Sequence, residues 1–235
     1  RRYDCTLQMG GSDQWGNLTS GTDLIRKVEG KSVHILATPL ITNSDGQKFG
    51  KSEGNAVWLD ADFTSPYAFY QFWLNVDDAD VIDRLKVFTF LTKAEIEDLA
   101  KQTAEAPHLR AAQKRLALEV TTLVHSAEAA QAAIDASAAL FGQGDLAALD
   151  AATLQSALGE LPNTQAAIGT PITQLLIETG LVDSISAGRR AIKEGGVYVN
   201  NEKIIDEAAV LTDLLHSKFA VLRRGKKTLA GVFTA

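Results

Sequence analysis

The chain has 235 residues, of which 46% are hydrophobic and 22% are charged, and its formal net charge is −6. This composition can fill two or three small cores, and it excludes disordered, collagen-like and low-complexity classes. No stretch approaches the 18 apolar residues of a membrane span, no secretory signal is visible, and one cysteine excludes an internal disulfide. We therefore expect a globular, cytoplasmic protein with no membrane partner.

The opening part of the chain alternates between strand and helix patterns. Residues 3–9 form a strand-like run that ends at two glycines, and a helix capped by Ser12 and Asp13 is expected to run to residue 29. Residues 32–38 are a second strand-like run, and residues 42–55 form a polar loop with several glycines. Residues 1–60 are therefore expected to form an α/β domain.

The middle of the chain has a helical pattern and almost no glycine before Gly142. We predict a helical bundle over residues 61–160, with one helix beginning at Ser65-Pro66. The helical spacing of its aromatic residues favours a packed core over platforms for stacked bases. These residues are Phe69, Tyr70, Phe72, Trp73, Phe88 and Phe90.

The last part is predicted to be a separate small α+β unit. Residues 161–169 contain proline, asparagine and glycine but little apolar content, which favours a linker. Residues 170–235 then form the unit, with helices expected at 172–179 and 184–193. Four strand-like runs follow the pattern of apolar alternation, at 197–200, 203–205, 219–224 and 228–233.

Charge is distributed unevenly between these parts. Residues 1–164 carry 14 Lys and Arg against 22 Asp and Glu, whereas residues 165–235 carry 9 against 7. The basic residues near the end are Lys218, Arg223, Arg224, Lys226 and Lys227. An acidic body with a basic terminal unit is typical of a module that binds a polyanion, although a solvated basic tail has the same composition.

The first candidate site follows the first predicted strand, at Gly10-Gly11-Ser12-Asp13. Glycines between a strand and a helix let a ligand approach the backbone, and the helix N-terminus favours an anion. A carboxylate at Asp13 is suited to accept hydrogen bonds from ribose hydroxyls. The alternative is that Asp13 only caps the helix.

The second candidate site is Lys48-Phe49-Gly50-Lys51-Ser52, in the glycine-containing loop. Two lysines separated by a glycine can close over phosphates and stabilise negative charge as it develops. The frame of a Walker loop does not occur around them. The alternative is a solvated lysine loop without a ligand.

The third candidate site lies within residues 187–200. Arg189, Arg190 and Lys193 are spaced to share one helical surface, and Gly195-Gly196 can end that helix before a strand. A basic helix beside a small β unit can bind RNA phosphates by shape.

These three sites, in this order, resemble the bacterial tyrosyl-tRNA synthetases, which are class I aminoacyl-tRNA synthetases. The string Gly-Gly-Ser-Asp-Gln-Trp-Gly-Asn at residues 10–17 is highly specific for that family, and residues 48–52 resemble its form of the KMSKS signature. Residues 187–200 resemble the S-four-like RNA-binding domain that closes bacterial members. Tryptophanyl-tRNA synthetases share the general plan but lack the Trp-Gly-Asn continuation and that domain.

The resemblance implies a fold and a reaction. The fold would be the second half of a Rossmann-like nucleotide-binding domain, a helical anticodon-side domain and an S-four-like RNA-binding domain. In the reaction, the tyrosine carboxylate attacks the α-phosphate of ATP to give tyrosyl-adenylate and pyrophosphate, and the tyrosyl group then passes to tRNA(Tyr). The implied partners are therefore tyrosine, ATP and tRNA(Tyr).

The resemblance also assigns roles to single residues. Gly11 would lie against the nucleotide and Asp13 would bind its ribose. Gln14 would position the tyrosine carboxylate, and Gln8 would line the tyrosine pocket. The residues that would hold the pyrophosphate are Lys48, Lys51 and Ser52. The RNA-binding residues would be Arg189, Arg190 and Lys193.

The chain departs from the family at its front. The family's HIGH-type phosphate motif and much of the tyrosine pocket come from a half-fold that would precede Arg1, and no His-x-Gly-His pattern occurs here. We therefore expect a fragment that does not activate tyrosine alone. Mg²⁺ is expected to arrive with ATP, since no carboxylate cluster identifies a metal site on the protein. The parent is expected to be a homodimer with its interface mostly before Arg1, which would leave the fragment monomeric.

An alternative of another class is a non-catalytic tRNA-binding module. In that interpretation the helical and S-four-like parts engage tRNA without any chemistry. Salt-dependent tRNA binding without pyrophosphate exchange would favour the module.

We predict that Lys51→Ala lowers adenylate formation by the intact enzyme roughly a hundredfold or more, because the transition state loses one preorganised charge. Tyrosine-dependent exchange of labelled pyrophosphate into ATP measures this rate. Near-normal exchange in the variant would remove Lys51 from the mechanism.

Overall fold

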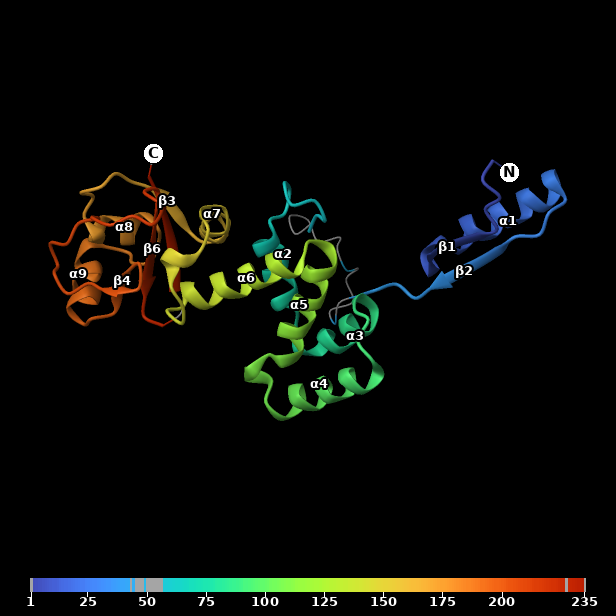
Figure 1. The fold of residues 1–235 in the computed structure, drawn as a ribbon, viewed down its shortest axis with the longest axis horizontal. Helices are drawn as coiled ribbons and strands as arrows, with labels where there is room; N and C mark the ends of the chain where they lie inside the picture. The colour runs from blue at the N-terminus through green and yellow to red at the C-terminus, as the bar shows by residue number, and fades with distance from the viewer. Residues whose placement is uncertain (1, 43, 45–48, 50–56, 227, 235) are drawn as a thin grey trace. The chain divides into compact units, whose positions relative to one another are not determined.

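The computed structural model describes residues 2–42, 44, 49, 57–226 and 228–234. The chain divides into two compact units, residues 1–56 and residues 57–235 (Figure 1). The first division therefore falls at residue 56 rather than at the predicted residue 60. No helix in the described part of the chain combines the length and the apolar composition that crossing a bilayer requires.

The first unit is a strand–helix–strand element. Strand β1 (Leu7–Gly11) pairs in parallel with β2 (His34–Thr38), and α1 (Trp15–Glu29) connects them after a 3₁₀ turn at Ser12–Gln14. A helical crossover is the usual way to join parallel neighbours. The predicted order of strand, helix and strand is confirmed, although β1 begins at Leu7 and includes Gly10 and Gly11, where the strand was expected to have ended. The predicted cap is wrong, since neither the 3₁₀ turn nor α1 has a side-chain capping hydrogen bond.

The second unit begins with helices. Their bounds are α2 Pro66–Leu74, α3 Asp78–Phe88, α4 Lys93–Glu105, α5 Ala111–Val124, α6 Ala127–Leu140 and α7 Ala151–Gly159, with 3₁₀ turns at Pro107–Leu109 and Leu146–Ala148. Helices α2 to α6 pack on one another and are called the helical bundle below. A helical middle part was predicted from the sequence.

Local sequence signals explain where several of these helices begin. The side chains of Ser65, Ser126 and Asp150 accept hydrogen bonds from amides in the first turns of α2, α6 and α7. Thr92 and Glu95 form a reciprocal capping box at the start of α4. The hydrogen bond from the Thr153 side chain lowers the pKa of Asp150, so this cap stays ionised at neutral pH.

Aromatic rings fill the core of the bundle. Phe69, Tyr70 and Trp73 are buried, and the ring of Trp73 lies 4.9 Å from that of Phe88 between centroids. The predicted aromatic core is confirmed for these residues. It is wrong for Phe90, which is 90% exposed. Helix α3 ends at residue 88, so the helical period no longer directs the following side chains inward.

The C-terminal part forms a five-stranded sheet in the order β3-β7-β6-β4-β5. The bounds are β3 Asn163–Gln165, β4 Val197–Val199, β5 Glu202–Lys203, β6 Phe219–Arg224 and β7 Thr228–Phe233, with helices α8 Ile172–Glu178 and α9 Ile185–Lys193. Residues 163–234 are called the C-terminal domain below. Strand β3 runs parallel to β7, and the other pairs are antiparallel.

Residues 163–165 were predicted to lie in a linker, and this is wrong. They form β3, whose partner residues are 231–233 of β7. The strand is only three residues long and polar, so its own pattern carries no strand signal. It is a strand because β7 supplies a free edge for its backbone hydrogen bonds.

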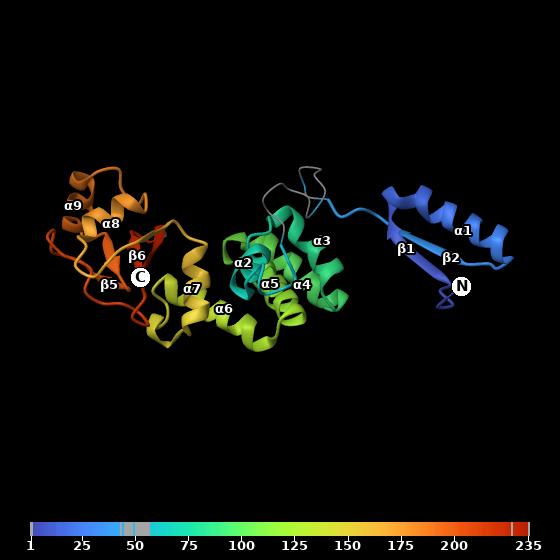
Figure 2. The ribbon, with the colours of Figure 1, turned by 90° about the horizontal axis from the view of Figure 1, so that it is seen from above.

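The sheet of the C-terminal domain is covered on both faces. Helices α8 and α9 lie together on one side, and α7 lies on the other (Figures 1 and 2). Leu175, Leu176 and Ile192 bury their side chains against Val197 and Leu222 of the sheet. On the α7 side, Gly231 lies so close to Leu158 that a Cβ there would be 3.0 Å from Leu158 Cβ.

We predict that Gly231→Ala destabilises the protein by about 1–3 kcal/mol, because the added methyl group meets α7 in a well-packed contact. The midpoint of urea unfolding measures the change. Gly159→Ala at the end of α7 is the control, since a Cβ there meets nothing within 4 Å. Equal midpoints for the two variants would contradict the packing of α7 on the sheet.

Candidate nucleotide and RNA sites

The end of β1 packs tightly on the first turn of α1. A Cβ at Gly10 would lie 3.4 Å from Gln14 Cβ and 3.6 Å from Leu18 Cδ2, and Leu18 is fully buried. The glycine therefore lets the strand end and the helix start approach each other. This holds the turn between them in one place.

The carboxylate of Asp13 lies over Gly11. A Cβ at Gly11 would be 2.8 Å from Asp13 Oδ1 and 3.0 Å from Leu40 Cδ2, so the space above the Gly11 backbone is already bounded on two sides. Asp13 itself is exposed. The turn thus presents bare backbone and an acidic oxygen side by side, which suits recognition of a sugar with vicinal hydroxyls.

The two glutamines predicted to bind tyrosine, Gln14 and Gln8, have different neighbours. Gln14 lies in the same turn as Asp13, and its Oε1 accepts a hydrogen bond of 2.9 Å from Asn17 Nδ2. Gln8 lies earlier on β1, where its Oε1 is 3.1 Å from the position that a Cβ of Gly21 would take. Gln8 therefore rests on α1. Asn17 was not among the predicted site residues, although its i, i+3 spacing from Gln14 on one helix face was a usable signal.

The lysine loop is described only at its base. Lys48, Lys51 and Ser52 lie outside the described residues. The amide of Phe49 donates a 3.0 Å hydrogen bond to the carbonyl of Ile41, three residues after β2 ends. Because β1 and β2 are parallel and Gly11 pairs with Thr38, Ile41 follows the same edge of the sheet that carries Asp13. Ligands of open parallel sheets bind at this carboxyl edge.

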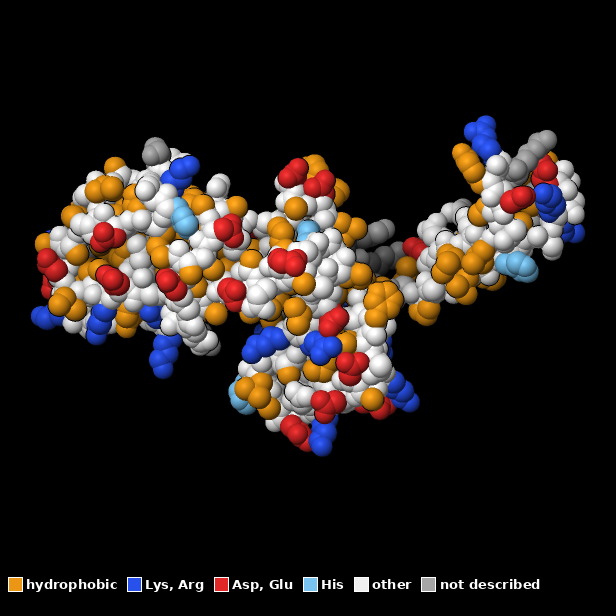
Figure 3. Space-filling model, in the orientation of Figure 1, with side chains coloured by type: hydrophobic (Ala, Val, Ile, Leu, Met, Phe, Trp, Pro, Cys, Tyr) orange, Lys and Arg blue, Asp and Glu red, His pale blue; other side chains and the backbone are white. Residues whose placement is uncertain are grey.

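The basic helix of the C-terminal domain exposes its predicted residues. Ser184 caps α9, and Gly188 on its inner face lets α8 approach to 3.5 Å from the Cβ position. Arg189, Arg190 and Lys193 are exposed on the outer face and form no ion pair with any described residue. Figure 3 shows Lys and Arg side chains gathered along the edge of the domain near α9 and β4.

Lys203 is a further basic residue that the sequence argument missed. It lies on β5, and its Nζ and Cε are in contact distance of the place where a Cβ of Gly195 would lie. Gly195 follows the end of α9, so Lys203 brings a cation to the C-terminal end of that helix. The left-handed backbone at Gly195, where φ is +71°, could be predicted from the glycine. The approach of a lysine from β5 could not be predicted from any local pattern.

Two arginines of the terminal basic cluster have structural partners instead. Arg224 Nη1 donates a 2.6 Å hydrogen bond to Leu181 O. The guanidinium carbon of Arg223 lies 4.0 Å from the ring centroid of Tyr198. Not every cation of this cluster is therefore free to bind a polyanion. The exposed cations of α9 are better placed to contact phosphates.

Comparison with known proteins identifies the class. Residues 2–142 match the sequence model of the class I tRNA synthetases (W and Y), so the chain belongs to that family. Residues 153–231 match the model of the tyrosine–tRNA ligase SYY-like C-terminal domain, a range that includes α7 and β3. The predicted fold class is confirmed: a synthetase catalytic part with half of a Rossmann-like fold, a helical part and an S-four-like C-terminal domain.

The similar curated proteins are tyrosine–tRNA ligases, which confirms the resemblance seen in the sequence. The ligase of Leifsonia xyli is 64% identical over 99% of this chain and 53% of its own length. The ligase of Streptomyces coelicolor is 59% identical over 99% of this chain and 56% of its own length. A C-terminally truncated mitochondrial tyrosyl-tRNA synthetase of Aspergillus nidulans is 33% identical, covers 55% of this chain and 37% of its own, and has a TM-score of 0.48.

The chain spans about half the length of the curated relatives that it matches.

We predict that the double charge reversal Arg189→Glu/Arg190→Glu weakens tRNA binding and flattens its dependence on salt, by about one unit of slope for each phosphate that the variant no longer neutralises. Filter binding over a series of salt concentrations measures both. The control is Arg26→Glu/Lys27→Glu on α1, which changes the net charge equally at two residues already paired with Asp23. Equal affinities for the two variants at low salt would contradict an RNA surface on α9.

Proposed function

We propose that the protein containing this chain is a tyrosine–tRNA ligase that activates tyrosine with ATP and transfers it to tRNA(Tyr). The relatives that match 99% of this chain carry this name, and the two family models match successive parts of the chain. The structural observation that carries the proposal is the turn at Gly11–Asp13. It presents backbone and a carboxylate at the carboxyl edge of a parallel strand pair.

In the first step a tyrosine carboxylate oxygen forms a bond to the α-phosphorus of ATP. The bond between that phosphorus and the β-bridging oxygen breaks, and pyrophosphate leaves with the electron pair. In the second step the terminal ribose hydroxyl of the tRNA attacks the tyrosyl carbonyl, loses its proton and releases AMP. Neither step needs a covalent bond to the enzyme, so catalysis depends on positioning and preorganised charge.

Asp13 and Gly11 would hold the adenosine part. The Asp13 carboxylate lies at the mouth of the turn and can accept hydrogen bonds from both ribose hydroxyls. Gly11 has no side chain to keep a nucleotide away from its backbone. Gln14 would orient the tyrosine carboxylate with its Nε2, since its Oε1 is already held by Asn17.

Gln8 and the lysine loop complete the proposal. Gln8 would line the tyrosine pocket from β1. Lys48, Lys51 and Ser52 would hold the pyrophosphate as negative charge builds up on it. The base of their loop is joined to Ile41 near the same sheet edge, which supports a shared ligand.

The remaining parts of the proposal concern the setting of the reaction. Mg²⁺ would arrive bound to ATP phosphates, which is how proteins usually hold it. Among the described residues no three His, Cys, Asp or Glu side chains gather as metal ligands. A cytoplasmic location is part of this proposal, supported by the tRNA and ATP that the reaction uses, and a homodimeric whole protein stays a prediction.

A second candidate function is a tRNA-binding module without chemistry. The observation that favours it is the exposed set of Arg189, Arg190 and Lys193 on α9, which forms no ion pair within the described part of the chain and needs nothing from the first unit. In both candidates these residues, with Lys203, would meet tRNA phosphates.

We predict that a hybrid ligase, in which this chain replaces the matching region of the Leifsonia xyli protein, exchanges pyrophosphate into ATP in the presence of tyrosine. In the hybrid, Asp13→Ala should lower exchange at limiting ATP about tenfold to a hundredfold, because the nucleotide loses hydrogen bonds to a charged group. The control is Ser12→Ala, an exposed neighbour in the same turn.

Three results would contradict parts of this proposal. A hybrid that is folded and binds tRNA but never exchanges pyrophosphate would favour the non-catalytic module. Equal exchange by the Asp13 and Ser12 variants would remove Asp13 from nucleotide binding. Exchange with another amino acid in place of tyrosine would overturn the assigned substrate.

A further inference from the structure

The C-terminal end of α6 meets the C-terminal domain. Helix α6 ends at Leu140, and Gly142 follows with a left-handed φ of +78°. The amides of Gly142 and Gln143 turn back to the carbonyls of Ala139 and Ala138, at 3.0 and 2.9 Å. In such a glycine cap, backbone amides just after the helix donate hydrogen bonds to some of its last carbonyls. The rest of this end is contacted from residues 201 and 223.

Asn201 supplies a capping hydrogen bond from 62 residues away in sequence. Its Nδ2 donates to the carbonyl of Ala139 at 2.8 Å. Asn201 is the second residue of the two-residue turn between β4 and β5, with a φ of +68°. Its neighbour Asn200 bonds only within the C-terminal domain, to Asp213 O and Val221 N. Adjacent asparagines thus hold the turn together and attach it to α6.

Arg223 lies at the same helix end. Its Nη2 and the Oδ1 of Asn201 are each 3.6 Å from the place where a Cβ of Gly142 would lie. A guanidinium near the last carbonyls of a helix interacts favourably with the helix dipole. Tyr198, which pairs directly with Arg223 across the two strands, holds the guanidinium over its ring. The cation is therefore positioned by the sheet and directed at α6.

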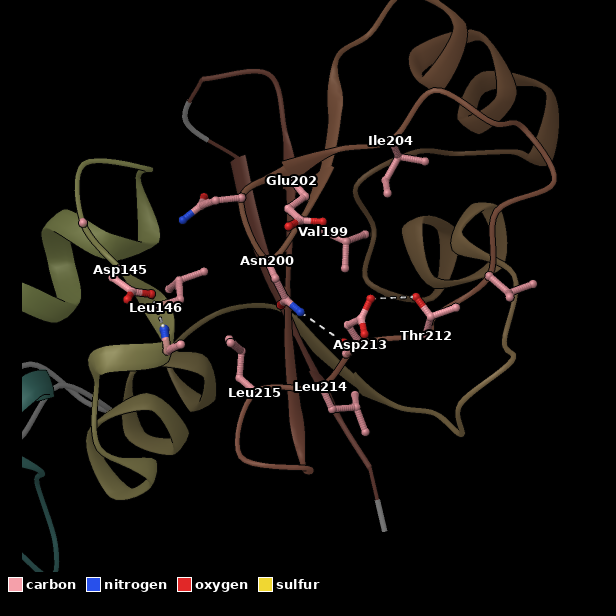
Figure 4. Close-up of a pocket in the computed structure, with 14 residues that line it drawn as sticks. Asp145, Leu146, Val199, Asn200, Glu202, Ile204, Thr212, Asp213, Leu214 and Leu215 are labelled. Carbon is pink, nitrogen blue, oxygen red and sulfur yellow. Dashed lines mark hydrogen bonds between the residues drawn. The ribbon is translucent and has the colours of Figure 1, made fainter.

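Residues 141–162, which connect α6 to β3, are attached to the C-terminal domain at two further points. His216 Nε2 donates to Leu149 O at 2.7 Å, and Gly231 packs on Leu158. An open cavity of about 510 Å³ lies between residues 144–147 of this segment and the C-terminal domain. Figure 4 shows Asp145 and Leu146 on one side of it, with Asn200, Glu202 and Leu215 on the other. The junction therefore combines these polar contacts with buried apolar side chains of the connecting segment, among them Leu146, Leu149 and Leu158.

The polar contacts at α6 include two buried atoms that have no hydrogen-bond partner in the described part of the chain. These atoms are Asn201 Oδ1 and Arg223 Nε. Burying such groups has a free-energy cost of the same order as the hydrogen bonds that are made. The loss of one donor should therefore open the junction measurably.

From these contacts we propose that Asn201 and Arg223 form a latch that holds the C-terminal domain on the end of α6. The latch fixes the orientation of α9 relative to the helical bundle, so that one tRNA can contact both. Asn201 and Arg223 are then positioning residues that need not touch RNA themselves. The consequence for tRNA rests on the proposed function, whereas the latch itself does not.

The test uses Asn201→Gly in the full chain. Glycine accepts the left-handed backbone at this position, so the turn is preserved while the donor to Ala139 is removed. We expect the amides of Gly142 and Gln143 to exchange with deuterium about three to ten times faster, as one hydrogen bond of ordinary strength predicts. The control is Gln174→Ala, which removes an exposed amide that bonds only to Glu178 on α8.

The second measurement is tRNA binding over a range of salt concentrations. Asn201→Gly should lower affinity about three- to tenfold with an unchanged salt slope, because no charge is altered. Arg223→Lys, which keeps the charge but shortens the reach to α6, should behave in the same way. A variant in a direct phosphate contact would change the slope instead.

Three outcomes overturn one of these statements each. Unchanged exchange at Gly142 and Gln143 overturns the latch. Faster exchange with unchanged tRNA affinity overturns the positioning of α9. If the unaltered chain binds no tRNA at any salt concentration, the proposed function is contradicted, and the exchange rates alone then decide whether the latch exists.

Discussion

At the end of β1 the space above Gly11 is shared by the Asp13 carboxylate and the Leu40 side chain. A side chain at position 11 would displace one of them, and the approach of α1 to Gly10 prevents the turn from moving away. Everything proposed for the nucleotide depends on this constraint. It holds an acidic oxygen beside backbone that carries no side chain, at the edge of the sheet where parallel strands commonly meet their ligands.

The C-terminal domain separates its cations into two kinds. Those on the outer face of α9 are exposed and form no ion pair with a described residue, whereas Arg223 and Arg224 are committed to Tyr198, α6 and Leu181. Both kinds look alike in a count of charges. The first kind, together with exposed Lys218 and Lys226, is available to displace counterions from a polyanion. The second kind determines where the first kind is presented.

Much of the fold was predictable because its signals are local. The strand, glycine turn and helix of the first unit follow from apolar alternation and from the need for small residues at a tight turn. The start of α2 follows from a serine cap before a proline. The predictions were wrong at the end of a helix and where a strand forms only through its pairing with another strand. Phe90 lies just past the end of α3, and β3 is a strand only because β7 offers its edge.

Three things could be derived from the amino-acid sequence alone: the order of the parts, the family, and the residues that lie within one turn of each other, such as Asp13 with Gly11 or Arg189 with Lys193. These relations depend on the helical and extended periods of the backbone, which act over a few residues. Only the fold shows that Lys203 approaches Gly195 at the end of α9, that Arg223 lies over Tyr198, and that Asn201 caps a helix 62 residues earlier in the chain. Such contacts arise from packing between segments that are distant in sequence. A local sequence pattern does not predict which distant segment will pack against it.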